Sequence, residues 1–525
     1  MGIVAYPLNP INNKKKSVGH KMTQIETIEH NFKFWGHNCF SIQTDHSVLL
    51  IDPWFSDSGA FFGSWFQHPK NHHLEDTVLD LLVKSSNSFV FITHEHQDHY
   101  DLNFLKRIPL STTIIIPNYE DKTFRDEVKN LGRDLIELSD NEKQNLDEAM
   151  QIYLIISDIG INHDSAMVVK TDDFTFLNQN DCKVFDRLHE INDPIDYYSV
   201  QFSGATWHPS CFVFSEKRKR HISSKKVENK FNNVLSGIKQ LNPKFFLPAA
   251  GPAIFPFLES DLSMGKGNIF VHQNELSDFL VSEGFTDSLF LKPGDFLDAT
   301  LREPIPAPDE SDINAYKDAV VDVWSSLPEV LNRESLERSI RDRLLNIKDI
   351  EIKNCPILIF NFSDEFNSKD HTNNKKIFID LNRKIIIEKF DYSKDYEEII
   401  STEKYFNLMC SEKWQNVYLS LRARVVRRPD VFNNDLNIFV FSDASNIEKN
   451  YLYTRNIPKE RVEVESESGE IFEIDRFCPH QGADLCNAKI SSDNMLICPR
   501  HSWKFDLNSG GKNISSGESI NAVQK

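Results

Sequence analysis

Short runs of alternating apolar and polar residues fill roughly the first 300 positions of the chain and predict strands joined by loops, with few helices. Residues 32–43 and 47–54 are expected to form two strands joined by a turn at residues 44–46. Residues 89–93 are expected to form a buried strand, because this run is apolar almost throughout. We therefore expect residues 24–303 to form one α/β domain.

The pattern changes at the proline-rich segment 304–308, which predicts a linker. Residues 312–345 predict one or two amphipathic helices, and the apolar runs between residues 350 and 441 predict a small α+β domain. The expected organisation is multidomain, α/β and β: a disordered leader at residues 1–23, then domains at 24–303, 304–446 and 447–525.

Composition narrows the possible classes of protein. A chain of 525 residues is expected to hold several domains, and its net charge of −19 argues against nucleic-acid binding. The eight cysteines are few for this length and favour reduced thiols in a cytoplasmic protein. No apolar run approaches the roughly 20 residues needed to span a bilayer. The composition does not decide whether the protein forms a homo-oligomer.

The C-terminal region contains two mixed pairs, Cys478-x-His480 and Cys498-x-x-His501. Two thiolates and two imidazoles suit either a [2Fe–2S] cluster or a structural zinc ion. Zinc fingers normally pair Cys with Cys and His with His, whereas each pair here is mixed. The two segments resemble the cluster-binding loops of Rieske domains, which implies an electron-transfer module. Arg500 and Lys504 flank the second loop and are candidates for docking an acidic electron donor, with a plain surface role as the alternative.

A second motif, H-x-H-x-D-H, directly follows the predicted strand at residues 89–93. In a loop after a strand, two His at i and i+2 can reach one metal ion, while the Asp and His that follow turn toward a second. This spacing resembles the metallo-β-lactamase fold, an αββα sandwich. The resemblance implies further ligands at His163 and Asp181, with Asp98 and His99 as candidate catalytic residues. The predicted metal ligands are His94, His96, Asp98, His99, His163 and Asp181.

The resemblance also implies a last His after a late strand, but the segment 245–255 contains none. His208 and His272 are the alternatives, or the second metal site is weak or empty.

The combination of domains resembles the CMP-N-acetylneuraminate hydroxylase (monooxygenase) family. Residues 51–55, 202–206, 248–251 and 414–430 carry this resemblance besides the two motifs. In the animal enzymes of this family the Rieske module comes first, whereas here it comes last. The resemblance implies hydroxylation of a CMP-linked sialic acid, a nucleotide-linked sugar.

The expected function is that of an iron-dependent monooxygenase. A ferredoxin or cytochrome with its reductase would reduce the [2Fe–2S] cluster, which would pass electrons to iron, and O₂ would oxidise a small-molecule substrate. One or two iron ions are expected because zinc has no accessible redox change, although zinc or manganese remains an alternative. The alternative function is a metal-dependent hydrolase with a redox-regulatory Rieske domain.

A basic run at residues 217–220, followed by Lys225 and Lys226, stands out in this acidic chain. It predicts either contact with a phosphate-bearing molecule or a solvated helix face.

Overall fold

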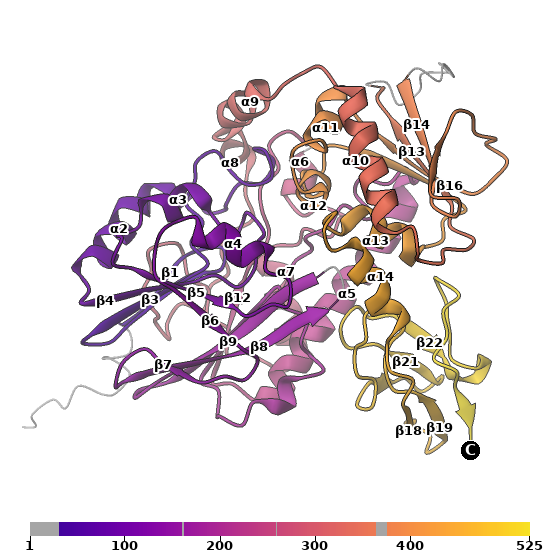
Figure 1. Cartoon of the computed structure of the whole chain (residues 1–525). Coiled ribbons are helices and arrows are strands. Elements are labelled where there is room, and N and C mark those ends of the chain that lie inside the picture. Colours follow the sequence, from indigo (N-terminus) through magenta and orange to yellow (C-terminus); the bar gives the residue numbers. More distant parts are fainter. Residues whose placement is uncertain (1–30, 160–161, 259, 364–374) are drawn as a thin grey trace, which may run out of the picture.

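The computed structural model describes residues 31–159, 162–258, 260–363 and 375–525. The predicted leader at residues 1–23 lies outside these described residues. Figure 1 shows the chain as an N-terminal sandwich, a middle domain beside it and a C-terminal β domain that contacts both.

The first sheet of the sandwich has the order β1-β2-β3-β4-β5-β6. Its first three strands pair antiparallel through short turns, whereas β3 to β6 pair parallel. Parallel strands need crossover connections, and these are largely helical here. The elements are β1 (Phe32–Gly36), β2 (Cys39–Gln43), β3 (Ser47–Ile51), η1 (His72–Leu74), α2 (Glu75–Lys84), β4 (Asn87–Phe91), α3 (Leu102–Arg107), β5 (Thr113–Pro117), α4 (Thr123–Lys129) and β6 (Leu135–Leu138).

The second sheet has the order β12-β11-β10-β9-β8-β7 and faces the first across a shared apolar core. Helices α5 and α7 pack on its other face, where their apolar residues join a separate core cluster. This arrangement is the predicted αββα sandwich. The elements are β7 (Gln144–Asn145), β8 (Met150–Ile159), β9 (Asn162–Thr171), β10 (Thr175–Asn180), η2 (Leu188–Glu190), β11 (Tyr197–Gln201), α5 (Glu216–Leu241), β12 (Phe245–Ala249), α6 (Ser260–Ser263) and α7 (Gln273–Ser282).

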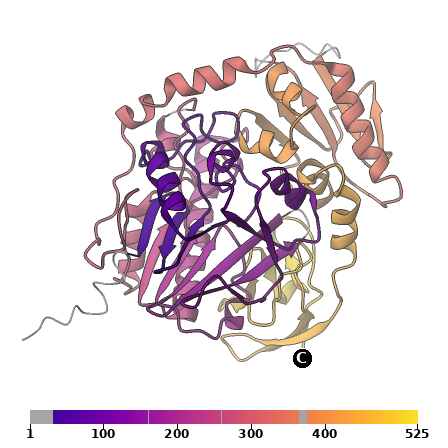
Figure 2. The ribbon, with the colours of Figure 1, turned by 60° about the vertical axis from the view of Figure 1, so that its left-hand side comes forward.

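The middle domain is built on a sheet of order β15-β14-β13-β16-β17, with helices packed against it (Figure 1). Figure 2 shows that the helices connecting the sandwich to this domain run across the top of the molecule. The elements are α8 (Glu310–Asn314), α9 (Lys317–Ser326), α10 (Arg333–Asn346), β13 (Ile357–Asn361), β14 (Lys376–Asp380), β15 (Ile385–Ile387), β16 (Tyr396–Ile400), α11 (Glu403–Leu408), α12 (Trp414–Leu419), β17 (Arg424–Arg428), α13 (Asn434–Phe441) and α14 (Ile447–Arg455).

The C-terminal domain pairs its strands in the orders β18-β19-β24 and β20-β21-β22-β23 around a small core that includes Cys478 and Cys498. No described helix is long and apolar enough to cross a bilayer. The elements are β18 (Arg461–Glu465), β19 (Ile471–Asp475), β20 (Lys489–Ile490), β21 (Met495–Ile497), β22 (Lys504–Asp506), η4 (Leu507–Ser509), β23 (Lys512–Asn513) and β24 (Val523–Gln524).

Candidate functional site

The H-x-H-x-D-H loop follows strand β4 and brings its side chains into two groups. Potential ligand atoms of His94, His96 and Asp181 lie within 4.8 Å of one another, and so do those of His37, Asp98 and His99. Nitrogen and carboxylate donors in sets of three are suited to first-row metals such as iron, manganese or zinc. The loop therefore contributes His94 and His96 to one group and Asp98 and His99 to the other.

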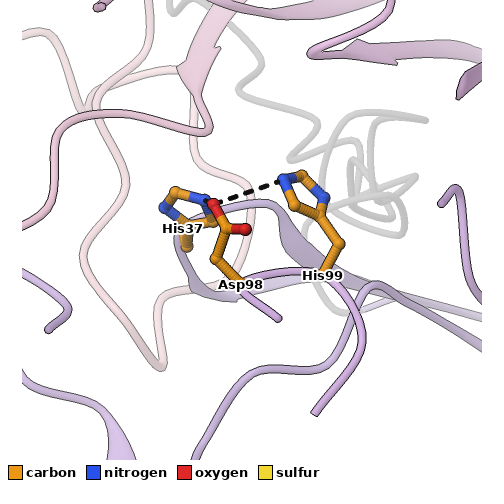
Figure 3. A group of neighbouring side chains, drawn as sticks. All are labelled: His37, Asp98 and His99. Atoms are coloured by element: carbon orange, nitrogen blue, oxygen red, sulfur yellow. Dashed lines mark hydrogen bonds and ion pairs between the residues drawn. The ribbon is translucent and has the colours of Figure 1, made fainter. Parts of the chain in front are cut away.

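His37 is the member of the second group that sequence reasoning missed. It lies in the turn between β1 and β2, and its Nε2 is 3.2 Å from an oxygen of Asp98 (Figure 3). Gly36, at φ +119°, and His37, at φ +51°, allow the tight turn. The His37 carbonyl accepts a hydrogen bond of 2.9 Å from the Ala250 amide just past β12. His37 thus lies beside the strand end where a last ligand was expected.

Asp52 fixes the orientation of the His99 ring by contacting the nitrogen that faces away from the metal group. Its carboxylate is fully buried and lies 2.7 Å from Nδ1 of His99. The same carboxylate accepts hydrogen bonds from Asn38 and Thr93, which fix its position. A proton held on Nδ1 leaves the lone pair of Nε2 directed into the site.

The Nε2 of His99 and the Oδ1 of Asp181 lie 3.4 Å apart and are both buried without a hydrogen-bond partner among the described residues. Unpaired buried polar atoms are costly unless a ligand satisfies them. Burial alone would lower the pKa of His99, but Asp52, Asp181 and Asp98 raise it well above its usual range. Carboxylates that favour a proton on His99 also favour a metal ion, so the donor set fits one.

His96 is poised to bind metal in its neutral form. Burial, together with the charge of His94, lowers the pKa of His96 to about 4. The Nε2 of His96 is 2.9 Å from the Gln415 amide nitrogen, and its Nδ1 faces Nε2 of His94 at 2.8 Å. The nitrogens that face each other are therefore the ones available to a metal ion.

The strand β9 directs Asp164, and not His163, toward the site. Nδ1 of His163 is 2.6 Å from Asp158, whereas Oδ1 of Asp164 is 3.3 Å from Nδ1 of His94. Neighbouring residues of a strand point to opposite faces, so only one of these two side chains can face the site. His163 thus lies outside both groups, whereas the Asp164 carboxylate lies behind His94, at the nitrogen that faces away from His96.

The two alternative histidines lie elsewhere. His272 precedes α7 with its Nε2 2.6 Å from the Ser263 carbonyl oxygen. His208 packs edge-on against Phe212 and Phe214. Neither belongs to the two groups formed by the described residues, whereas His37 does.

The four C-terminal ligand candidates lie on two tight turns. Hydrogen bonds from Gly482 N to Cys478 O (2.8 Å) and from Ser502 N to Cys498 O (2.9 Å) close these turns. A hydrogen bond with the Cys498 thiol, with burial, raises the pKa of Cys478 well above its usual range, so the two sulfurs are adjacent.

The two imidazoles of the turns also converge. The rings of His480 and His501 are 4.7 Å apart, and Nδ1 of His480 is buried without a partner among the described residues. Burial, with a smaller effect of Lys183, lowers the pKa of His480 to about 3, which keeps the imidazole neutral as an iron ligand must be. These paired sulfurs and imidazoles fit a [2Fe–2S] cluster of the Rieske type.

The cluster-binding loops dock onto the segment that carries Asp181. Asp186 accepts from Nε of Arg500 at 3.1 and 3.2 Å and from the Asp484 amide at 3.2 Å. The side chains of Asp186 and Arg500 are only 4% and 7% exposed. Arg500 therefore joins the two domains and is not free to dock an electron donor, which corrects the interpretation from the sequence.

Lys183 lies two residues after Asp181, and its side chain is exposed. Its charge interacts with those of Asp181 and Asp164. Burial, followed by the charge of Lys183, also lowers the pKa of His501 well below its usual range. One side chain thus interacts electrostatically with residues of both sites.

Comparisons with known proteins agree with this geometry. The Rieske [2Fe-2S] domain model matches residues 437–523, and the beta-lactamase superfamily domain model matches residues 31–171. The chain thus has a metallo-β-lactamase fold followed by a Rieske domain, which implies a [2Fe–2S] cluster.

Three relatives extend this result. A protein of Mycolicibacterium smegmatis is 26% identical over 529 residues, and one of Mycobacterium tuberculosis strain H37Rv is 25% identical over 523 residues. Each match covers 90% of this chain and 96% of the relative, and their names describe them only as Rieske 2Fe-2S iron–sulfur proteins. A cholesterol 7-desaturase of Caenorhabditis elegans is 29% identical over 94 residues, covering 18% of this chain and 22% of its own. The Rieske domain and these relatives indicate an oxidoreductase.

Proposed function

We propose that the chain is a Rieske-coupled oxygenase in which the sandwich domain holds iron. The observation that carries this proposal is the buried Asp186–Arg500 pair, because it fixes the cluster-binding loop against the segment that begins with Asp181. A cluster that passes electrons to a neighbouring metal site needs a metal that changes oxidation state there, and zinc does not. When bound, iron supplies O₂ activation and the [2Fe–2S] cluster supplies single electrons.

The proposed iron ligands are His94, His96 and Asp181 for one ion and His37, Asp98 and His99 for a second. Asp98 and His99 remain the proposed catalytic residues because both belong to the second of these groups, with His37. Asp52 and Asp164 orient His99 and His94 through the nitrogens that face away from the proposed metal ions. The carboxylate-rich surroundings favour iron or manganese over zinc, which prefers nitrogen and sulfur donors.

The proposed partners are O₂, a ferredoxin or cytochrome with its reductase, and a small organic substrate. CMP-linked N-acetylneuraminate is the first substrate to test, on the resemblance of residues 51–55, 202–206, 248–251 and 414–430 alone.

Metal analysis of anaerobically purified protein tests the proposal. The full chain is compared with a variant that carries Cys478→Ala and Cys498→Ala, and with a second that adds His94→Ala and His96→Ala. We expect the first variant to keep iron after losing the cluster, and the second to lose that iron. Full occupancy by zinc in the first variant would contradict the proposal and favour the alternative, a metal-dependent hydrolase.

A further inference from the structure

A pocket of about 530 Å³ lies between the sandwich and the middle domain. Residues 209–223 and 257–268 form its sandwich side, and Trp324 with residues in 402–424 forms the other. Among the described residues, no member of the two metal groups and none of the four cluster ligands lines it. A pocket of this volume at a domain boundary is suited to a small organic molecule.

The lining is basic, although the chain as a whole is acidic. Two acidic residues, Glu216 and Asp261, face five basic ones, which are Lys219, Arg220, Lys266, Arg422 and Arg424. In the described structure only Lys266 of these five has a salt bridge, at 3.7 Å to Asp261. The other four have no carboxylate partner among the described residues, although the chain has 78 acidic against 59 basic residues, and this indicates an anionic ligand.

Arg422 is held in place by neutral groups. Its Nε donates to Ser64 Oγ at 2.9 Å and its Nη2 to the Gly63 carbonyl at 3.3 Å. The guanidinium lies 4.0 Å from the ring centroids of both Phe257 and Trp324. Burial lowers the pKa of Arg422 to about 10, which still leaves it charged at neutral pH. A guanidinium fixed in this way is preorganised to bind an oxyanion.

The start of helix α5 adds to this charge. Ser215 caps the helix by accepting from the Arg218 amide, and residues 217–220 are all basic. Cations in a first helical turn oppose the helix dipole, which favours anions there. Of this run, Lys219 and Arg220 line the pocket, whereas Lys217 does not. The N-terminal end of α5 and these two cations therefore favour an anion at the same place.

We propose that this pocket binds a small phosphate-bearing molecule, with Arg422 as its fixed anchor and Arg220 and Arg424 as further contacts. A phosphate group offers up to two negative charges and three acceptor oxygens, so it can meet several cations at once, whereas a single carboxylate has two oxygens. Because both domains line the pocket, the ligand stabilises their contact. The proposal does not depend on the metal content of the sandwich.

Calorimetric titration of the full chain with inorganic pyrophosphate tests the proposal, with citrate as the carboxylate probe. We expect saturable pyrophosphate binding that weakens with added salt. The double variant Arg220→Met with Arg424→Met removes two exposed charges from the lining and should weaken binding by roughly tenfold to a hundredfold, the usual effect of losing charge-assisted hydrogen bonds. Arg422→Lys keeps the positive charge but removes the planar guanidinium with its paired N–H donors. It should weaken pyrophosphate binding by about tenfold.

Lys217→Met with Lys225→Met is the matched control, because it removes two exposed charges of α5 that lie outside the lining. The control should bind pyrophosphate like the native chain and keep the same thermal shift with ligand. Equal affinity in the lining variant and the control would overturn the proposal, as would the absence of saturable binding. Tighter binding of citrate than of pyrophosphate would overturn the assignment to phosphate. The visible spectrum of the cluster verifies that each variant is folded.

Discussion

At the scale of single residues, Asp52 shows how a side chain that is not itself a ligand candidate can shape the metal centre. It is fully buried, and its carboxylate holds Nδ1 of His99 at 2.7 Å. We predict that Asp52→Asn lowers metal affinity by roughly tenfold to a hundredfold, the usual effect of removing such a partner. Metal content after dialysis against a weak chelator measures this change.

Asp45→Asn is the control for this prediction, because Asp45 is exposed in the turn between β2 and β3. It should leave metal retention unchanged. If Asp52→Asn retains metal as well as the native chain does, Asp52 does not orient His99 as described here.

The sequence predicts those site residues whose relation is local. The spacing of residues 94–99 within one loop indicates metal ligands without knowledge of the fold. His37 comes from a different hairpin and reaches the site only because its turn meets the end of β12. Which of His163 and Asp164 lies beside His94 depends on the face of β9 that each occupies. A one-residue error in the position of the strand reverses the answer.

At the scale of elements, helix α12 of the middle domain supports the metal-binding loop. Lys413 precedes this helix and forms salt bridges with Glu95 and, at 3.1 Å, with Glu127. We predict that Lys413→Met lowers the free energy of unfolding by about 1–3 kcal/mol at neutral pH, because it leaves partly buried carboxylates without a cation. Chemical denaturation followed by circular dichroism measures the change.

The stabilisation by Lys413 depends on pH. Burial would raise the pKa of Glu95, but Lys413 outweighs it and lowers the pKa. A lowered pKa in the folded state adds stability that is present above the unfolded value and lost as pH falls through the folded value. The difference between Lys413→Met and the native chain should therefore shrink in acid. Lys394→Met, which changes an exposed residue of the same domain, is the control and should have little effect at either pH. A difference in free energy of unfolding between Lys413→Met and the native chain that does not change with pH would contradict the account.

Element boundaries show a similar limit of sequence reasoning. The helical pattern at residues 312–345 predicts one or two helices, whereas the structure has α8, α9 and α10 there. Helix α9 ends at Ser326, shortly before Pro328, which cannot continue it. The periodicity shows that residues 312–345 are helical, but it does not show where one helix ends and the next begins.

At the scale of the whole molecule, the contact between the Rieske domain and the sandwich could not be predicted. The two motifs lie far apart in the sequence, so their spacing does not show whether the cluster-binding loops meet the metal-binding domain within one chain. The structure brings Arg500 against Asp186 within one chain. Two oppositely charged residues widely separated in sequence give no signal that they form a pair.

The central claim is that electrons pass from the Rieske cluster to the sandwich site within one chain. The most direct measurement is the rate at which O₂ re-oxidises the dithionite-reduced cluster, followed by its visible absorption in a stopped-flow instrument. Asp186→Asn, which weakens the domain contact, and His94→Ala with His96→Ala, which removes metal ligands, should each slow re-oxidation by at least about tenfold. Equal rates in the native chain and both variants, with cluster spectra unchanged, would contradict the claim.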